Sequence, residues 1–275
     1  MLGFVGFLLV FGYQLATLYT DSQWFNELGQ SAVFSKTLGA RLQLFFGFGL
    51  LFFLIVYFNL WLARRLNAAI PSSRPFRGLH LDIERDRVTE MMKLGANRFA
   101  TIVTIVLSVL VAFNAASQWS DYLQFTHAGS FGKADPIFGN DIGFYVFRLP
   151  FLSFLQGWLT FTIIAALVIT ALFHLTQGSV NLDGQKAHVE RHVIRHILAL
   201  VGILAIAFAW RTWLSRFDLL TRENGPFFGA GYTDLHARLP ALNLQAFALV
   251  LTGAFCIVNI WRGKPFRLQI GRAHV

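Results

Sequence analysis

The sequence predicts an all-α integral membrane protein: a six-helix bundle of three helical hairpins in the same orientation, with short helical loops on the outer side. Three observations support this prediction. The 275 residues are 55% hydrophobic and only 13% charged, whereas soluble domains carry about 25% charged residues. Six apolar runs approach the length that crosses a bilayer, about 20 helical residues. A sequence pattern also recurs at the outer ends of two of these runs.

The six predicted spans organise residues 1–269 into one membrane bundle. They are Leu2–Tyr19, Leu42–Ala63, Ala100–Trp119, Phe151–His174, Ile197–Trp213 and Ala241–Trp261. The first run lacks the basic start and the small-residue cleavage site of a signal peptide, so we expect it to be retained as a span.

The basic residues predict the orientation of the spans. Of the 23 lysines and arginines, 15 lie in the segments that follow spans two, four and six, and 8 lie on the opposite side. Cytoplasmic segments carry the excess of basic residues, so both ends of the chain are predicted to be cytoplasmic. The net charge of +9 therefore reflects topology and not nucleic-acid binding, and the lipid bilayer is the predicted partner. Within the first basic segment, Leu79–Ala96 is predicted to form an amphipathic surface helix or to pack beneath the bundle.

The recurring pattern occupies two of the predicted outer loops. Pro136-Ile137-Phe138-Gly139 precedes Arg148-Leu149-Pro150, and the same pattern recurs 90 residues later as Pro226-Phe227-Phe228-Gly229 and Arg238-Leu239-Pro240. Proline is favourable in the first turn of a helix, where its missing N–H has no partner. We therefore expect Pro150 and Pro240 to begin equivalent return helices.

An arginine stands two residues before each of these prolines. Each arginine lies near the positive end of a helix dipole, which is unfavourable unless an anion compensates it. We expect Arg148 to pair with Asp141, and Arg238 with Asp234, or either arginine to bind a lipid phosphate. These pairs would fix the outer loops as structural caps on the bundle.

Other polar residues allow two interpretations each. Asp135, Asp141, Asp234 and His236 could converge on a hard cation, or the carboxylates could serve turns and helix caps. His188, His192 and His196 recur every fourth residue in a predicted helix, as metal ligands or as surface histidines. Interhelical hydrogen bonding, or a polar substrate path, would explain the polar residues in or near the spans: Asn59, Asn114, Gln156, Asn243, Gln245 and Asn259. No catalytic or cofactor-binding motif is present, so we expect a non-enzymatic protein without a cofactor.

Three longer stretches carry a family resemblance. The segments 21–25, 135–151 and 229–242 resemble signatures of uncharacterised protein family 0182, which comprises large bacterial multi-pass membrane proteins. The resemblance implies a membrane bundle followed by a large extracytoplasmic region, which we expect to be absent from this chain. It also implies the bacterial inner membrane. The last residues, 270–275, match one reading frame of a sequencing adapter and are predicted to be a non-native tail.

The expected function is a membrane anchor or scaffold for the extracytoplasmic region, because the spans lack Asp, Glu and Lys while the repeated motifs lie in outer loops. The alternative is a transporter or channel built on the hairpin repeat. Envelope-protein partners and self-association both remain open.

Overall fold

The structure, a computed structural model, describes residues 2–68, 82–177, 180–183, 186–224 and 227–262. Within these ranges the chain is mostly helical, as predicted. The elements are α1 (Leu2–Glu27), α2 (Ser31–Ala68), α3 (Asp82–Ser117), α4 (Trp119–Thr126), the π-helical turn η1 (Phe144–Arg148), α5 (Leu149–Thr176), β1 (Val180–Asp183), β2 (Lys186–Val189), α6 (Arg191–Leu214), α7 (Asp218–Thr221), β3 (Glu223–Asn224), β4 (Phe227–Phe228), the π-helical turn η2 (Asp234–Arg238) and α8 (Leu239–Arg262). Strands β1 and β2 pair antiparallel, as do β3 and β4.

Five helical segments of the described chain are long and apolar enough to cross a membrane. They are Ser31–Asn67, Leu94–Ser117, Phe144–Thr176, Arg191–Leu214 and Asp234–Ile260. Each overlaps one of the five predicted spans from Leu42 onward, although the predicted spans three and six end one or two residues beyond Ser117 and Ile260. The helical membrane class is therefore supported. The first predicted span, Leu2–Tyr19, lies in α1 and is not among the five, so it stays a prediction.

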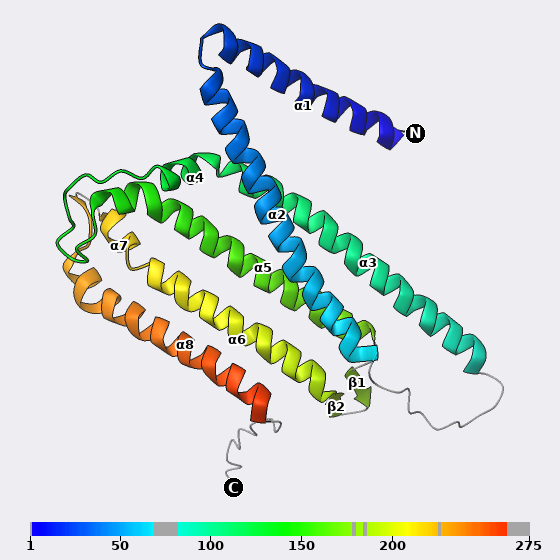
Figure 1. Cartoon of the computed structure of the whole chain (residues 1–275). Coiled ribbons are helices and arrows are strands. Elements are labelled where there is room, and N and C mark those ends of the chain that lie inside the picture. The colour runs from blue at the N-terminus through cyan, green and yellow to red at the C-terminus, as the bar shows by residue number, and fades with distance from the viewer. Residues whose placement is uncertain (1, 69–81, 178–179, 184–185, 225–226, 263–275) are drawn as a thin grey trace.

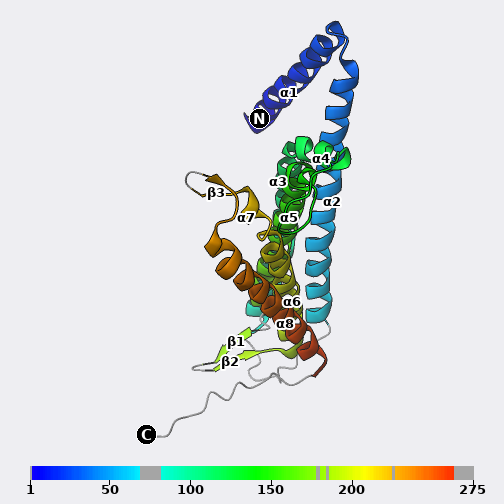
Figure 2. The ribbon, with the colours of Figure 1, turned by 90° about the vertical axis from the view of Figure 1, so that its left-hand side faces the viewer.

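The long helices form one layer in the order α3, α2, α5, α6 and α8. Each packs chiefly against its neighbours in this order. Figure 1 shows the five helices side by side, and Figure 2, turned by 90°, shows how thin the layer is. The helices of the second predicted hairpin, α3 and α5, therefore contact each other less than each contacts α2. Helix α1 meets α2 near the turn that joins them and otherwise stands apart (Figure 1).

Helix α2 is apolar on two faces. Its inner face presents Phe52, Val56, Leu60 and Ala63, which are completely buried against α3 and α5. Its outer face presents a second apolar stripe whose side chains are at least half exposed: Phe46, Leu50, Leu54 and Phe58. A helix that is apolar all round suits a lipid environment on its unpacked side.

The segment that follows α2 differs from the sequence prediction. We expected Leu79–Ala96 to form an amphipathic surface helix or to pack beneath the bundle, but residues from Asp82 onward are the first turns of α3 itself. The only Gly in this part of α3 is Gly95, and the segment contains no proline, so nothing local forces the helix to end before the apolar run. The predicted non-native tail, 270–275, lies outside the described residues.

Glycines bring α6 and α8 together. A Cβ atom on Gly253 of α8 would lie 2.9 Å from the carbonyl oxygen of Gly202 on α6 and 2.7 Å from Cγ1 of Ile206. A backbone carbonyl cannot turn aside as a side chain can, so the two helices would have to separate. Small residues allow this close approach between membrane helices, where packing drives association.

A matched pair of substitutions tests this contact. Gly253→Ala is expected to lower the stability of the protein by about 1–3 kcal/mol because it overpacks the α6–α8 crossing. Gly157→Ala on α5 has nothing within 4 Å of the added Cβ and is expected to raise stability by up to about 1 kcal/mol through helix propensity. Thermal unfolding in detergent measures both changes, and equal effects of the two variants would contradict the close packing.

Candidate functional site

The two copies of the repeated motif have the same local structure. In each, a five-residue π-helical turn ends at the arginine, and an α-helix begins at the following leucine. The N–H of Leu149 donates to the carbonyl of Phe144, and the N–H of Leu239 donates to the carbonyl of Asp234. Pro150 and Pro240 are thus each the second residue of a return helix, α5 and α8, as the sequence predicted.

The prolines explain the π-helical turns. A proline within a continuous helix has no N–H to donate, and its ring clashes with the carbonyl four residues earlier. A wider π turn directly before the proline relieves this clash without breaking the helix. The sequence Arg-Leu-Pro therefore produces the same entry into the membrane helix twice.

Asp135 organises the loop between α4 and η1. Its Oδ1 accepts hydrogen bonds from the N–H groups of Ile137 (2.9 Å) and Phe138 (2.6 Å). Its Oδ2 accepts from the N–H of Asn140 and from the Tyr145 hydroxyl, both at 2.8 Å. Burial alone would raise the pKa of Asp135, but these four donors together hold it below its ordinary value.

Asp141 closes the same loop from the other side. It accepts hydrogen bonds from the N–H of Phe131 (3.0 Å), the hydroxyl of Ser130 (2.7 Å) and the N–H of Gly143 (2.7 Å). The N–H of Phe131 and the Ser130 hydroxyl contribute most to lowering the pKa of Asp141 to about 2. Both carboxylates therefore serve the turn chemistry that was one of the two sequence interpretations.

An aromatic cluster joins this loop to the end of α6. The ring of Phe217 lies 5.1 Å from that of Phe138 and 5.0 Å from that of Phe144, in edge-to-face contacts. Phe217 is buried together with Leu149 and Leu214. The loop between α4 and α5 is thereby docked on the turn that follows α6, a contact that the sequence patterns did not indicate.

The expected arginine pairs form in one copy only. Nη1 of Arg238 lies 3.9 Å from Oδ1 of Asp234, one helical turn away. The expected Arg148–Asp141 pair does not form, because the Asp141 carboxylate is held by the loop. Arg148 is exposed, and within the described ranges it has no ion pair.

The proposed cation ligands do not gather. Asp135 and Asp141 are engaged in their own loop, Asp234 accepts from the N–H of Gly231, and His236 stacks on Tyr232. Among the described residues, no three His, Cys, Asp or Glu side chains are grouped as a metal site.

The histidine prediction needs a correction. His188 lies in strand β2, and α6 begins only at Arg191, so the three histidines do not share one helical face. The register is interrupted because the chain forms a β-hairpin before α6. Instead, His192 and His196 meet His174, which comes from α5 and was not singled out in the sequence.

An Asn–His chain links α2, α5 and α6 near the end of the layer where α2 and α5 end and α6 begins. It consists of Asn59 and Asn67 on α2, His174 on α5, and His192 and His196 on α6. His174 and His196 are buried, with 1% and 6% of their surface exposed. The side-chain contacts along it measure 3.2–3.3 Å. The sequence could have indicated this cluster, because Asn and His residues lie at the same end of the predicted spans two, four and five.

The remaining intramembrane amides mainly bond within or between helices. Nε2 of Gln156 on α5 donates to the carbonyl of Ala207 on α6 at 3.1 Å. Asn259 donates to the carbonyl of Phe255 in its own helix, and Asn243 accepts from Arg216. These contacts agree with the interhelical and local hydrogen bonding that the sequence allowed.

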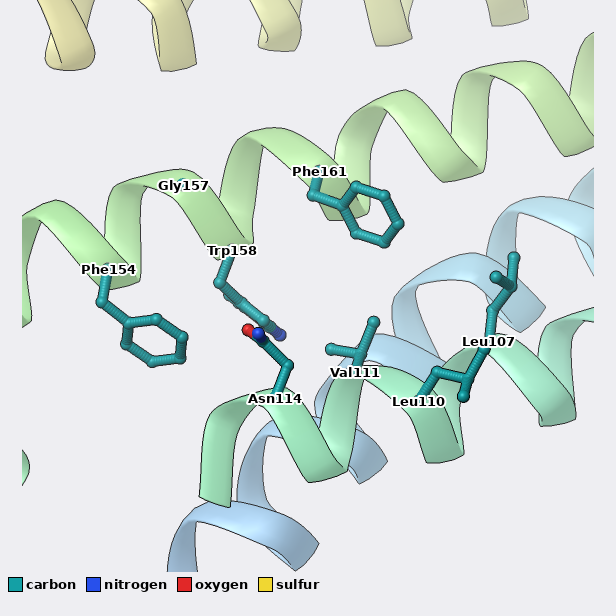
Figure 3. A pocket seen from close by; sticks show the side chains of 8 residues that line it. All are labelled: Leu107, Leu110, Val111, Asn114, Phe154, Gly157, Trp158 and Phe161. Carbon is teal, nitrogen blue, oxygen red and sulfur yellow. The ribbon is translucent and has the colours of Figure 1, made fainter. Parts of the chain in front are cut away.

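A groove of about 500 Å³ lies between α3 and α5. Figure 3 shows Leu107, Leu110 and Val111 on the α3 side and Phe154 and Phe161 on the α5 side. Asn114 and Trp158 are its polar members, and the indole N–H of Trp158 is buried with no hydrogen-bond partner among the residues that the structure describes. The groove is mainly apolar, and all of its lining residues come from α3 and α5.

The carboxylates of the outer loop predict its response to acid. Because its pKa is lowered on folding, the ionised carboxylate stabilises the folded loop at any pH above the ordinary pKa of Asp, about 3.9. This stabilisation is lost as the pH falls through the pKa of the folded state. With the pKa of Asp141 at about 2, loop 130–143 should stay ordered down to about pH 4 and open between about pH 4 and pH 2. Hydrogen exchange of the loop amides measures this opening. Asp141→Asn should lose protection even at neutral pH, and a loop indifferent to both acid and substitution would contradict the assignment.

The unequal arginines give a further prediction. Arg238→Ala removes a half-exposed ion pair and should cost no more than about 1 kcal/mol, with a cost that shrinks at high salt. Arg148→Ala removes no ion pair and should leave stability nearly unchanged. Thermal unfolding in detergent at two salt concentrations separates the variants, and a larger loss for Arg148→Ala would show that Arg148 holds an anion such as a lipid phosphate.

Comparisons with known proteins place the chain in a family. The model of the Uncharacterised protein family (UPF0182) matches residues 1–273. A UPF0182 protein of Geobacter sp. (strain M21) is 36% identical over 272 residues, which cover 98% of this chain and 29% of the relative. UPF0182 proteins of Pelobacter propionicus and Mycobacterium avium are 35% and 36% identical, covering 90% of this chain and 27% and 25% of their own lengths. No solved structure matches the chain. The chain thus spans less than a third of these relatives, and it belongs to the Uncharacterised protein family UPF0182.

Proposed function

We propose that this chain is the membrane-embedded anchor of a bacterial inner-membrane protein and holds an extracytoplasmic region in place without catalysing a reaction. The observation that carries the proposal is the contrast between the two parts of the layer. Its five long helices are apolar enough to span a membrane, whereas loop 130–143 at one end is tied down by two carboxylates and docked on Phe217. A loop held in one conformation at the end of an apolar helical layer suits an anchor that positions an extracytoplasmic region.

The orientation follows from the basic residues. The end with α4, α7 and the π-helical turns faces outward, and the end with the β1–β2 hairpin faces the cytoplasm, as does each end of the chain. The duplicated π-helical entry into α5 and α8 supports the idea of parallel hairpin repeats. Helices α1 and α2 form the first and most divergent hairpin of a six-helix arrangement.

The length of the relatives supports an anchoring role. The matched region is under a third of each of the three relatives compared above, so in those proteins most of the chain lies outside it. The family resemblance implies that this remainder is extracytoplasmic. Envelope proteins that contact the outer loops, and self-association through the exposed apolar helix faces, fit the same role.

A transporter or channel is the second candidate. The Asn–His chain favours it, because polar and ionisable groups within membrane helices often mark a transport path. The groove between α3 and α5 does not favour it, because apolar side chains make up most of its walls. The anchor is therefore the better-supported function.

The orientation can be tested by cysteine labelling in a Cys256→Ala background. Cysteines at the exposed positions Lys133 and Arg222 should react with a membrane-impermeant thiol reagent added to intact cells, and a cysteine at Arg191 should react only after the cells are opened. The reverse pattern would mean that the layer is inverted.

The anchoring role can be tested in a longer relative. Its remainder, secreted without the region that matches residues 1–262, should leave the membrane fraction, and restoring that region should return it. Retention of the remainder at the membrane without this region would overturn the anchor. Purified protein in liposomes provides the comparison with transport: an electrical or ion flux that is lost in His174→Gln would establish the second candidate.

A further inference from the structure

The Asn–His chain has one hydrogen-bond direction, which the backbone of α2 imposes. Nδ2 of Asn59 donates to the carbonyl of Ile55 at 2.8 Å, and Nδ2 of Asn67 donates to the carbonyl of Ala63 at 2.9 Å. Carbonyl oxygens only accept, so the amide nitrogens must face them. Each Asn Oδ1 is then left to accept a hydrogen bond from an imidazole.

The tautomers of the imidazoles follow from these acceptors. Nε2 of His196 donates to Oδ1 of Asn59, so its Nδ1 carries no proton and accepts from Nε2 of His174, at 3.3 Å. Nδ1 of His174 then accepts from Nδ2 of Asn67, at 3.2 Å. Nε2 of His192 donates to Oδ1 of Asn67, also at 3.2 Å. Every link from His192 through Asn67, His174 and His196 to Asn59 is satisfied when His174 and His196 are neutral.

This pattern of hydrogen bonds cannot accommodate an additional proton on His174 or His196. A charged His196 carries a proton on Nδ1, which would face the N–H of His174, and a charged His174 would set its Nδ1–H against the amide of Asn67. Reversing the chain to avoid these clashes would turn the Asn67 oxygen toward the carbonyl of Ala63. Two facing donors, or two facing acceptors, leave buried polar atoms unpaired, which destabilises the contact between the helices.

The surroundings would not compensate the charge. The guanidinium of Arg64 lies over the ring of Phe173, next to His174 in the chain, and α5 carries no Asp, Glu, Lys or Arg between Leu149 and Thr176. The charged residues at this end whose side chains the structure describes are Arg64 and Arg65 on α2, Arg98 on α3, and Glu190, Arg191 and Arg195 around the start of α6. Cations outnumber carboxylates in this set.

We propose that the Asn–His chain is a proton-sensitive lock, which holds α2, α5 and α6 together at the cytoplasmic end while its histidines are neutral and releases them when His174 or His196 is protonated. The lock joins the two sides of the layer, because α2 packs against α3 on one side and α6 packs against α8 on the other. Acidification of the cytoplasm would therefore loosen the contact between these two sides.

The full chain in detergent provides the first test, between pH 8 and pH 5.5. Free histidine titrates near pH 6.5, so the melting temperature should fall by about 5 °C across this range if one or two buried hydrogen bonds are lost. Asn59→Asp places a carboxylate at Nε2 of His196, where it compensates a proton, and should flatten the fall. His236→Gln and Asp218→Asn alter titratable groups at the outer end and should keep the pH profile of the unmodified chain.

A distance measurement between α2 and α6 tests the proposal without substituting any residue of the Asn–His chain. Spin labels at Trp61 on α2 and Ile203 on α6, both exposed, in a Cys256→Ala background should show a broader and longer distance distribution at pH 5.5 than at pH 8. An unchanged distribution, a flat melting profile, or a profile that His236→Gln or Asp218→Asn removes would each overturn the proposal.

Discussion

The structure depends on one constraint: a polar group buried in an apolar layer is costly unless it finds a partner within the protein. The Asn–His chain satisfies it where five side chains from three helices meet, and Gln156 satisfies it by reaching the backbone of α6. The same constraint acts at the outer end, where Asp135 and Asp141 together accept hydrogen bonds from the backbone and side chains of one loop. Polar atoms in this protein are therefore concentrated where helices meet or where the chain turns.

The repeated entry into α5 and α8 shows how a short motif meets this constraint. A proline placed on a continuous helix would leave a carbonyl without its donor and would collide with the preceding turn. The π-helical turns η1 and η2 accept the proline and keep the helix continuous. The two copies nevertheless differ in their electrostatics, since Asp234 sits within the π-helical turn beside Arg238, whereas Asp141 lies outside η1 and is held by its loop.

The sequence predicted those features that depend on neighbours along the chain. The apolar runs located five helices long and apolar enough to cross a membrane. The shared motif located Pro150 and Pro240, and the spacing of Asp234 and Arg238 predicted their pair. It did not predict the order of the helices in the layer. The reason is visible in α2: Phe52 and Phe58 are equally apolar, yet one is buried and the other faces outward. When both faces are apolar, hydrophobic periodicity carries no information about which helix packs where. The meeting of His174 with His196, and the docking of Phe138 on Phe217, depend on that order.

The single-layer arrangement has a mechanical consequence. In a closed bundle each helix is braced from several sides, but here a displacement of α8 reaches α3 mainly in series, through α6, α5 and α2. The protein therefore has a seam between α5 and α6, with α3, α2 and α5 on one side and the tightly crossed α6 and α8 on the other. A force applied to α8 would therefore be transmitted to α3 only while the contact between α5 and α6 stays intact.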